Sequence, residues 1–158
     1  MRRTLRRRRL EAKTDYRARI DLLKSEKPRL VIRKTNKYII AQIIESHLAQ
    51  DKVIIGVTSK DLLSKGWPKE FSGSLKSIPA AYLTGLLLGK VAKGRVKEAV
   101  LDIGLNRNIQ KSRLYSALNG VVDAGLIVPH SKEALPNIEE ISSNPKITKV
   151  FNKIKQEL

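Results

Sequence analysis

The sequence predicts an α/β protein built on a mixed β-sheet. Three segments rich in β-branched residues follow one another over residues 29–59, which predicts an antiparallel meander. Strand–helix–strand units come next, and such units predict right-handed crossovers with parallel pairing in the same sheet. With 158 residues, 41% of them hydrophobic, the chain is expected to form one domain with a modest core and with tails.

A strongly basic segment, residues 1–24, precedes the first strand and is predicted to form an arm. Residues 1–37 hold 15 Lys and Arg against 4 Asp and Glu, a net +11, whereas the other 121 residues hold 17 against 11, a net +6. Apolar residues at near-helical spacing predict one helix from Arg8 to Lys24. This helix is either an amphipathic helix docked on the body or an arm ordered by RNA, and the charge density favours the arm.

The predicted meander consists of strands at 29–35, 38–45 and 52–59. Asn36 and Lys37 lie between the first two strands, and a two-residue loop with Asn first suits a type I′ turn. The α/β body that begins with this meander is expected to span residues 25–130, and a tail with a helix to span 131–158.

Basic residues occur along the first strand and in the turn of the predicted hairpin. Alternation along the first strand places Arg29 and Arg33 on the same side, and the turn brings Lys34 and Lys37 close together. The guanidinium fork of Arg suits phosphate, and Lys supplies a point charge. The hairpin is therefore either a phosphate-binding surface or an ordinary charged hairpin, and charge alone does not separate the two.

A loop, a helix and a strand are predicted after the meander. The loop contains Trp67, which we expect to cover the edge of the core, with base stacking as the alternative. The helix spans 79–93, with Ser77 as its N-cap. The following run at 98–105 is nearly all apolar, as expected for a strand covered on both faces.

The end of the body and the tail are predicted from glycines, caps and periodicity. Gly85 and Gly89 are expected to let the first helix pack closely on the sheet. A second helix is predicted from the N-cap Ser112 to Gly125, followed by a short strand at 126–129. The amphipathic helix that ends the tail either packs on the body or docks on a partner.

Candidate catalytic and metal-binding residues form no recognisable motif. There is no cysteine, and His47 and His130 have no nearby Ser or Asp in a triad arrangement. Asp61, Asp102 and Asp123 share no spacing that a metal-dependent nuclease would use, and we expect Asp102 to bond an arginine or the backbone. No enzymatic activity, cofactor, metal or small-molecule substrate is expected, and no apolar run approaches the ~20 residues of a membrane span.

Several stretches of the sequence resemble the archaeal branch of the large-subunit ribosomal protein L-eighteen family: RRRRLEAKTDYRARIDLLKSEKPRLVIRKTNKYIIAQ, PAAYLTGLLLGK, EAVLDIGL and SALNGVVDAGLIVPHS. The resemblance runs from about Arg6 to Ser131. It implies a non-catalytic α/β/α layered domain with ribonuclease H-like topology. It also implies binding to 5S rRNA, attachment of that RNA to the large-subunit rRNA in the central protuberance, neighbouring ribosomal proteins as partners, and a cytoplasmic location on the ribosome.

The resemblance and the charge pattern together define three groups of expected RNA contacts. The arm contributes Arg2, Arg3, Arg6, Arg7, Arg8, Arg9, Lys13, Tyr16 and Arg17. The hairpin contributes Arg29, Arg33, Lys34, Thr35, Asn36 and Lys37, and the polar loop 107–113 contributes Lys111 and Arg113.

The chain departs from the family pattern in two places. Lys111 stands where the family usually has glycine, so charge would replace a close backbone approach to phosphate. The tail beyond about Ile138 lacks the family's usual ending.

A functional alternative is a basic module that binds an acidic protein or a membrane surface.

Overall fold

A four-stranded mixed sheet forms the centre of the molecule. The computed structural model describes residues 6–47, 50–141 and 145–158. Strands β1 (Arg29–Lys34), β2 (Ile39–His47) and β3 (Gln50–Thr58) form the expected antiparallel meander, and β4 (Val100–Asp102) pairs in parallel with β1. The strand order is β3-β2-β1-β4, which confirms a mixed α/β domain.

The hairpin turn differs from the expected type I′ conformation. Neither Asn36 nor Lys37 has the positive φ that a type I′ turn requires. The Thr35 N–H donates to the Tyr38 carbonyl oxygen at 2.9 Å, and the Thr35 hydroxyl oxygen accepts the Tyr38 N–H at 2.9 Å. A threonine side chain therefore closes the turn, which explains how the chain manages without the usual glycine.

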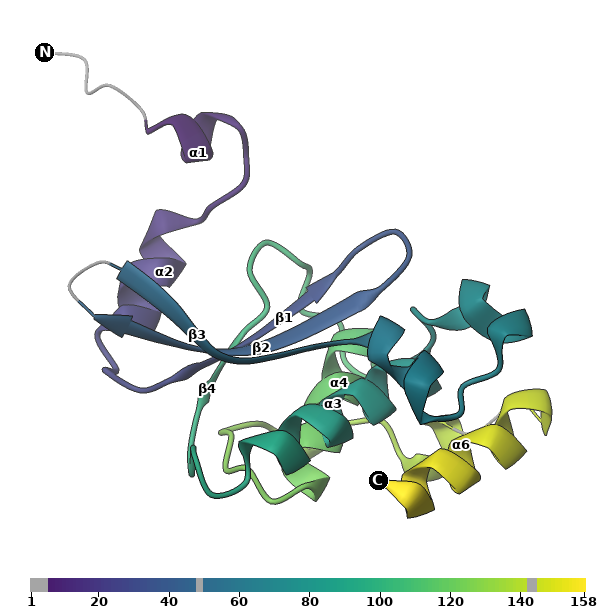
Figure 1. Cartoon of the computed structure of the whole chain (residues 1–158). Coiled ribbons are helices and arrows are strands. Elements are labelled where there is room, and N and C mark those ends of the chain that lie inside the picture. The colour runs from purple at the N-terminus through teal and green to yellow at the C-terminus, as the bar shows by residue number, and fades with distance from the viewer. Residues whose placement is uncertain (1–5, 48–49, 142–144) are drawn as a thin grey trace, which may run out of the picture.

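Two helices, α3 (Ile78–Ala92) and α4 (Arg113–Asp123), lie side by side under one face of the sheet (Figure 1). Their backbones touch at glycines. A Cβ atom at Gly85 would overlap the Ala117 carbonyl oxygen, and one at Gly120 would overlap that of Tyr82. The expectation that Gly85 and Gly89 pack on the sheet is wrong, because both face α4.

The caps and the last strands follow the predictions in part. The Ser77 side chain accepts the Ala80 N–H at 3.5 Å and begins α3, as expected. The strand expected at 98–105 shortens to β4, because the chain turns away at Gly104 with φ +61°. The strand expected at 126–129 reduces to one parallel bridge between Glu98 and Ile127, since Pro129 has no N–H to extend the ladder.

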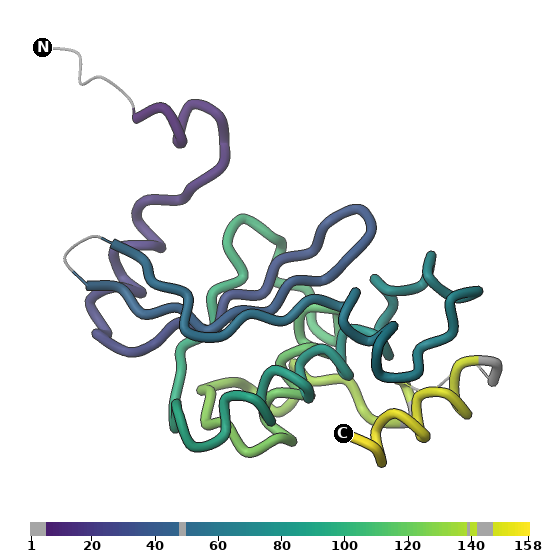
Figure 2. Tube along the Cα trace, in the orientation of Figure 1, coloured from purple at the N-terminus to yellow at the C-terminus, as the bar shows by residue number. Residues whose placement is uncertain are grey.

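The arm contains two short helices instead of the expected single helix. Helix α1 (Arg7–Leu10) ends before Ala12, which adopts a positive φ of 50°. Helix α2 (Tyr16–Leu23) begins anew because the Asp15 side chain accepts the N–H groups of Arg17 and Ala18. Figure 2 shows the start of the arm on the side of the sheet opposite α3 and α4.

The tail packs on the body. Helix α5 spans Ile138–Ile141 and helix α6 spans Pro145–Glu157. Phe151 of α6 is buried, and its ring centroid lies 5.5 Å from that of Tyr82 in α3. Of the two alternatives for this helix, the structure therefore shows docking on the body.

Tyr82 and Phe151 belong to a second hydrophobic core, which also contains Trp67. Two 3-10 helices, η1 (Ser59–Lys65) and η2 (Lys69–Ser74), lie around Trp67, and a third, η3 (Lys132–Ala134), precedes α5. Trp67 is only 2% exposed, and its Nε1–H donates to the Phe71 carbonyl oxygen at 3.1 Å. Trp67 thus covers the core as expected and offers no face for base stacking. Within the described residues, no helix has the length and apolar character to cross a bilayer.

Candidate nucleic-acid interface

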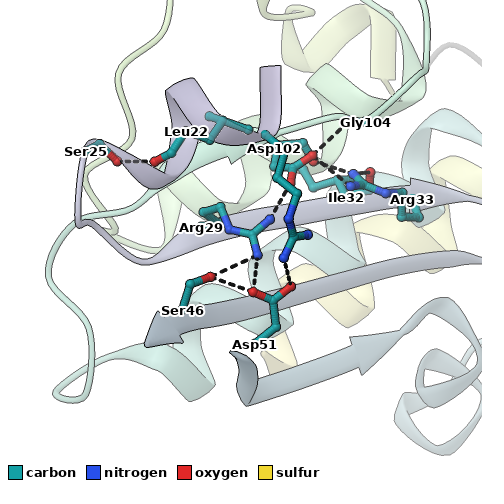
Figure 3. Close-up of polar contacts among 10 residues, drawn as sticks. Leu22, Ser25, Arg29, Ile32, Arg33, Ser46, Asp51, Asp102 and Gly104 are labelled. Carbon is teal, nitrogen blue, oxygen red and sulfur yellow. Dashed lines mark hydrogen bonds and ion pairs between the residues drawn. The ribbon is translucent and has the colours of Figure 1, made fainter. Parts of the chain in front are cut away.

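Two arginines of β1 are held by one buried aspartate. Arg29 and Arg33 point to the same side of the strand, as alternation predicts, and both reach Asp102 at the end of β4 (Figure 3). An Arg29 Nη1–Asp102 Oδ2 distance of 2.8 Å and an Arg33 Nη2–Asp102 Oδ1 distance of 2.7 Å define the two ion pairs. The expectation that Asp102 bonds arginine is confirmed.

A second aspartate ties this network to the arm. Asp51 of β3 pairs with Arg29 at 2.9 Å and with Arg19 of α2 at 2.8 Å, and it accepts the Ser46 hydroxyl at 2.6 Å. Burial raises the pKa of Asp51, but the hydrogen bonds from Ser46, Arg19 and Arg29 outweigh burial and lower it to about 2. Asp51 is therefore ionised at neutral pH and fixes α2 against the edge of the sheet.

Arg29 is a buried part of this ion-pair network. Its side chain is 4% exposed, and both terminal nitrogens are engaged with carboxylates. Arg33 retains more exposure, at 37% of its side chain, although its Nη1 also donates to the backbone oxygen of Asp102. Of the two expected hairpin arginines, only Arg33 is accessible to a polyanion.

Residues 6–13 of the arm carry more cations than their one carboxylate can balance. That carboxylate is Glu11, and it pairs with Lys13 at 2.7 Å and with Arg7 at 3.7 Å. The Arg8 Nε–H donates to the Thr14 hydroxyl oxygen at 2.9 Å. The Arg6 Cζ atom lies over the Tyr16 ring, 4.8 Å from the ring centroid. The remaining expected contacts of the described arm are exposed or half-buried: Arg6, Arg7, Arg9, Tyr16 and Arg17. Arg2 and Arg3 lie outside the described residues.

The hairpin turn presents its cations to solvent. Lys34, Asn36 and Lys37 are exposed, and their side chains make no ion pair or hydrogen bond with a described residue. The Thr35 hydroxyl, an expected RNA contact, also closes the turn through its hydrogen bonds with the Tyr38 backbone. The polar groups of the turn that remain free are therefore those at its tip.

The two expected contacts in the loop before α4 have different surroundings. Arg113 is exposed and unpaired within the described part of the chain. Lys111 binds Glu140 of α5 with an Nζ–Oε1 distance of 2.6 Å. This hydrogen bond, followed by one from the Asn137 N–H, lowers the pKa of Glu140. Lys111 has a φ of +56°, which lies in the region that favours glycine. Its backbone therefore has a conformation typical of glycine, while its ammonium group pairs with a carboxylate of the same protein.

Sequence reasoning missed Arg107 as a candidate contact. Arg107 is exposed, and it borders the same hollow as Lys34 and Arg113. The signal that could have identified it is its place in the polar loop that already supplied two candidates. In Figure 1 this loop rises on the side of the sheet where the β1–β2 turn and the arm also lie.

The carboxylates weighed for catalysis have structural partners. Asp61 accepts the Thr58 N–H at 2.8 Å as part of a capping box, and Asp123 accepts the Tyr82 hydroxyl at 2.6 Å. Burial, followed by the hydrogen bond to Asp123, raises the pKa of Tyr82. In the part of the chain that the structure describes, no three His, Asp or Glu side chains gather as metal ligands.

Comparison with known proteins gives consistent matches. The family model described as ribosomal large subunit proteins 60S L5 and 50S L18 matches residues 2–98 and 91–131. The chain is 52% identical over 136 residues to the large ribosomal subunit protein uL18 of Korarchaeum cryptofilum, covering 85% of this chain and 68% of that protein. Identity to the proteins of the same name is 48% in Methanothrix thermoacetophila (85% and 78% covered) and 47% in Methanothermobacter thermautotrophicus (85% and 69%).

These matches cover the body and most of the arm, and they identify non-enzymatic proteins, which confirms the expectation that the chain is not an enzyme. The exposed cations described above lie within the matched region. The chain belongs to the family of ribosomal large-subunit proteins 60S L5 and 50S L18.

Proposed function

We propose that this protein is a structural component of the large ribosomal subunit that binds 5S rRNA and helps attach it to the large-subunit rRNA. The observation that carries the proposal is the separation of charge. Arg29 on the sheet is buried between Asp51 and Asp102, whereas exposed cations belong to the arm, the β1–β2 turn and the 107–113 loop, which lie on one side of the sheet (Figure 1).

The arm and the turn would act by neutralising phosphates. Each phosphate contact releases condensed counterions, so binding is strong at low salt and weakens steeply as salt rises. Arg9 and Arg17 offer planar forks for phosphate, and Lys34 and Lys37 offer point charges. Asn36 at the turn adds a donor and an acceptor for sugar hydroxyls, which suits RNA because the A-form major groove is closed to side chains.

The ion-pair network would preorganise this surface. Arg19 and Asp51 attach α2 to the sheet, so the arm leaves the body in a fixed direction. The proposal includes a non-catalytic, ribonuclease H-like arrangement of layers. The order β3-β2-β1-β4 supports it, as does the Glu98–Ile127 bridge, which lies beyond β4 where a fifth strand would pair. Neighbouring large-subunit proteins complete the proposed set of partners.

The test is the binding of the purified chain to 5S rRNA and to an unrelated transcript of equal length at near-physiological ionic strength. We expect a clear preference for 5S rRNA. If the arm and the hairpin neutralise ~6 phosphates, affinity should fall ~10³-fold between ~50 and ~200 mM salt. Equal affinity for the two RNAs would overturn the assignment to 5S rRNA.

Ribonuclease treatment of a lysate separates the proposal from the alternative of a basic module that binds an acidic protein or a membrane. Co-sedimentation with large subunits should disappear after digestion if RNA is the partner. An association that survives digestion would favour the protein or membrane partner and contradict the proposal.

A further inference from the structure

A hollow of about 370 Å³ lies between the hairpin, the polar loop and the starts of α3 and α4. Its apolar lining comes from Ile78, Ile109 and Leu114. Ile109 is 57% exposed and lines the hollow beside cationic side chains. The volume falls within the range of ~300–1,000 Å³ typical of small-molecule sites.

The rim of this hollow is cationic. Lys34 comes from the end of β1, Arg107 from the loop and Arg113 from the first turn of α4. No Asp or Glu belongs to the lining, and none of the three cations forms an ion pair within the described residues. Their charge is therefore available to an anion, in contrast to that of Arg29.

A buried hydroxyl without a partner also lines the hollow. Ser112 is the N-cap residue of α4, but its side chain makes no capping hydrogen bond. Its Oγ atom is buried and has no hydrogen-bond partner. A buried hydroxyl left unpaired is unfavourable, and a ligand whose polar atom reached it would remove that penalty.

We propose that the hollow binds one unpaired nucleotide of the RNA. Its base would lie against Ile109 and Leu114, its phosphate would lie among the rim cations, and one of its polar atoms would bond Ser112 Oγ. Bases that are splayed out of single-stranded loops are the usual targets of sequence-specific RNA recognition, and they stack on aromatic rings or on guanidinium planes. In this hollow Arg107 and Arg113 would supply guanidinium planes, and the aliphatic side chains would add apolar contact. This inference rests on the proposed function and adds recognition of one base to a surface that otherwise reads phosphate and shape.

An uncharged substitution separates base binding from phosphate binding. Ile109→Ser removes the exposed apolar wall and leaves every charge in place. A base that covers Ile109 would bury part of an apolar side chain that Ser cannot replace, so we expect affinity for 5S rRNA to fall about 5- to 30-fold with an unchanged salt slope. Ile127→Ser is the matched control, because Ile127 is 66% exposed and does not line the hollow. The affinity of the Ile127→Ser variant for 5S rRNA should remain within twofold of that of the unsubstituted protein.

Two further measurements identify the occupant. Chemical probing of 5S rRNA should show one unpaired base that is protected by the unsubstituted protein and reactive in the Ile109→Ser complex. Binding to a fully paired RNA duplex should be equal for both proteins, because a duplex offers no free base. Unchanged affinity of Ile109→Ser for 5S rRNA, with no base newly reactive, would overturn the inference.

The outcomes distinguish this inference from the proposed function. If the unsubstituted protein prefers 5S rRNA and Ile109→Ser binds equally well, the proposed function stands and the hollow has no nucleotide. If the unsubstituted protein shows no preference, the proposed function itself fails. If Ile109→Ser weakens duplex binding as much as 5S rRNA binding, the side chain contacts the backbone and the nucleotide site is wrong.

Discussion

Arginines of the sheet and arginines of the arm have the same charge but opposite surroundings. Arg29 is almost fully buried between Asp51 and Asp102, whereas Arg9 and Arg17 are exposed and unpaired within the described chain. A buried arginine whose terminal nitrogens bind carboxylates has no donor to offer a polyanion, whereas an exposed and unpaired arginine is available to one. The difference teaches that the density of positive charge locates an RNA-binding region, whereas the carboxylates around each cation decide which residues bind.

The largest effect is expected when the buried network loses its charge. Asp102→Asn leaves Arg29 buried with one of its two carboxylates gone, and breaking a buried pair in this way costs about 3–5 kcal/mol of the free energy of unfolding. Urea denaturation measures this loss. Asp21→Asn is the control, because Asp21 forms an exposed pair with Lys24, and it should change stability by less than about 0.5 kcal/mol. Equal stability of both variants would place Asp102 outside the structural network.

The next effect concerns the exposed arm. Replacing Arg7, Arg8 and Arg9 together by Gln should lower the slope of log affinity against log salt by about 2–3, since each lost phosphate contact removes about 0.9. Stability in urea should change little, because these side chains bury no surface. The triple replacement by Lys keeps the charge and should keep the slope. A slope unaffected by Gln would show that the arm does not contact the RNA.

A smaller effect is expected from the titration of Asp51. Its folded pKa of about 2 lies below the ordinary value of 3.8, so its contribution is fully present above pH ~4 and is lost as the pH falls towards 2. The contribution is at most about 2 kcal/mol and is reduced by solvent, because the side chain is 31% exposed. The stability difference between the protein and Asp51→Asn should shrink between pH 5 and pH 2. A constant difference would contradict this linkage.

The smallest effect is expected at Lys111. Its φ of +56° is strained for lysine, and its ion pair with Glu140 is exposed and worth little. Lys111→Gly should therefore raise the free energy of unfolding by about 0.5–1 kcal/mol. Thermal denaturation measures the change, with Lys132→Gly, which has no positive φ, as the control that should not stabilise. Destabilisation by Lys111→Gly would show that the pair with Glu140 outweighs the strain.

The meander and the two main helices could be predicted because their signals are local. Alternating β-branched residues and the capping side chain of Ser77 lie within the elements that they define, and Ser112 marks the start of α4 although its side chain makes no capping hydrogen bond. The arm shows how two local signals compete. Apolar spacing favoured one long helix, but Asp15 caps a new helix and Ala12 ends the previous one, so the periodicity was misleading.

The candidate site could be predicted only in outline, because its ion pairs join distant segments. Asp102 lies 73 residues from Arg29, so no spacing rule links them. The same holds for Lys111, whose partner is in the tail that the resemblance did not cover. The exposed cations of the hairpin were identified from the charge pattern together with the resemblance, and Arg107 was missed because its neighbours in the hollow come from other elements.

The contact of α3 with α4 through glycines has a genetic consequence. Because the two backbones touch at Gly85 and Gly120, any larger residue there would displace α4 and with it Arg113 at its start. A screen for alleles that impair ribosome assembly should therefore recover substitutions at these buried glycines, although neither residue lies on the cationic surface.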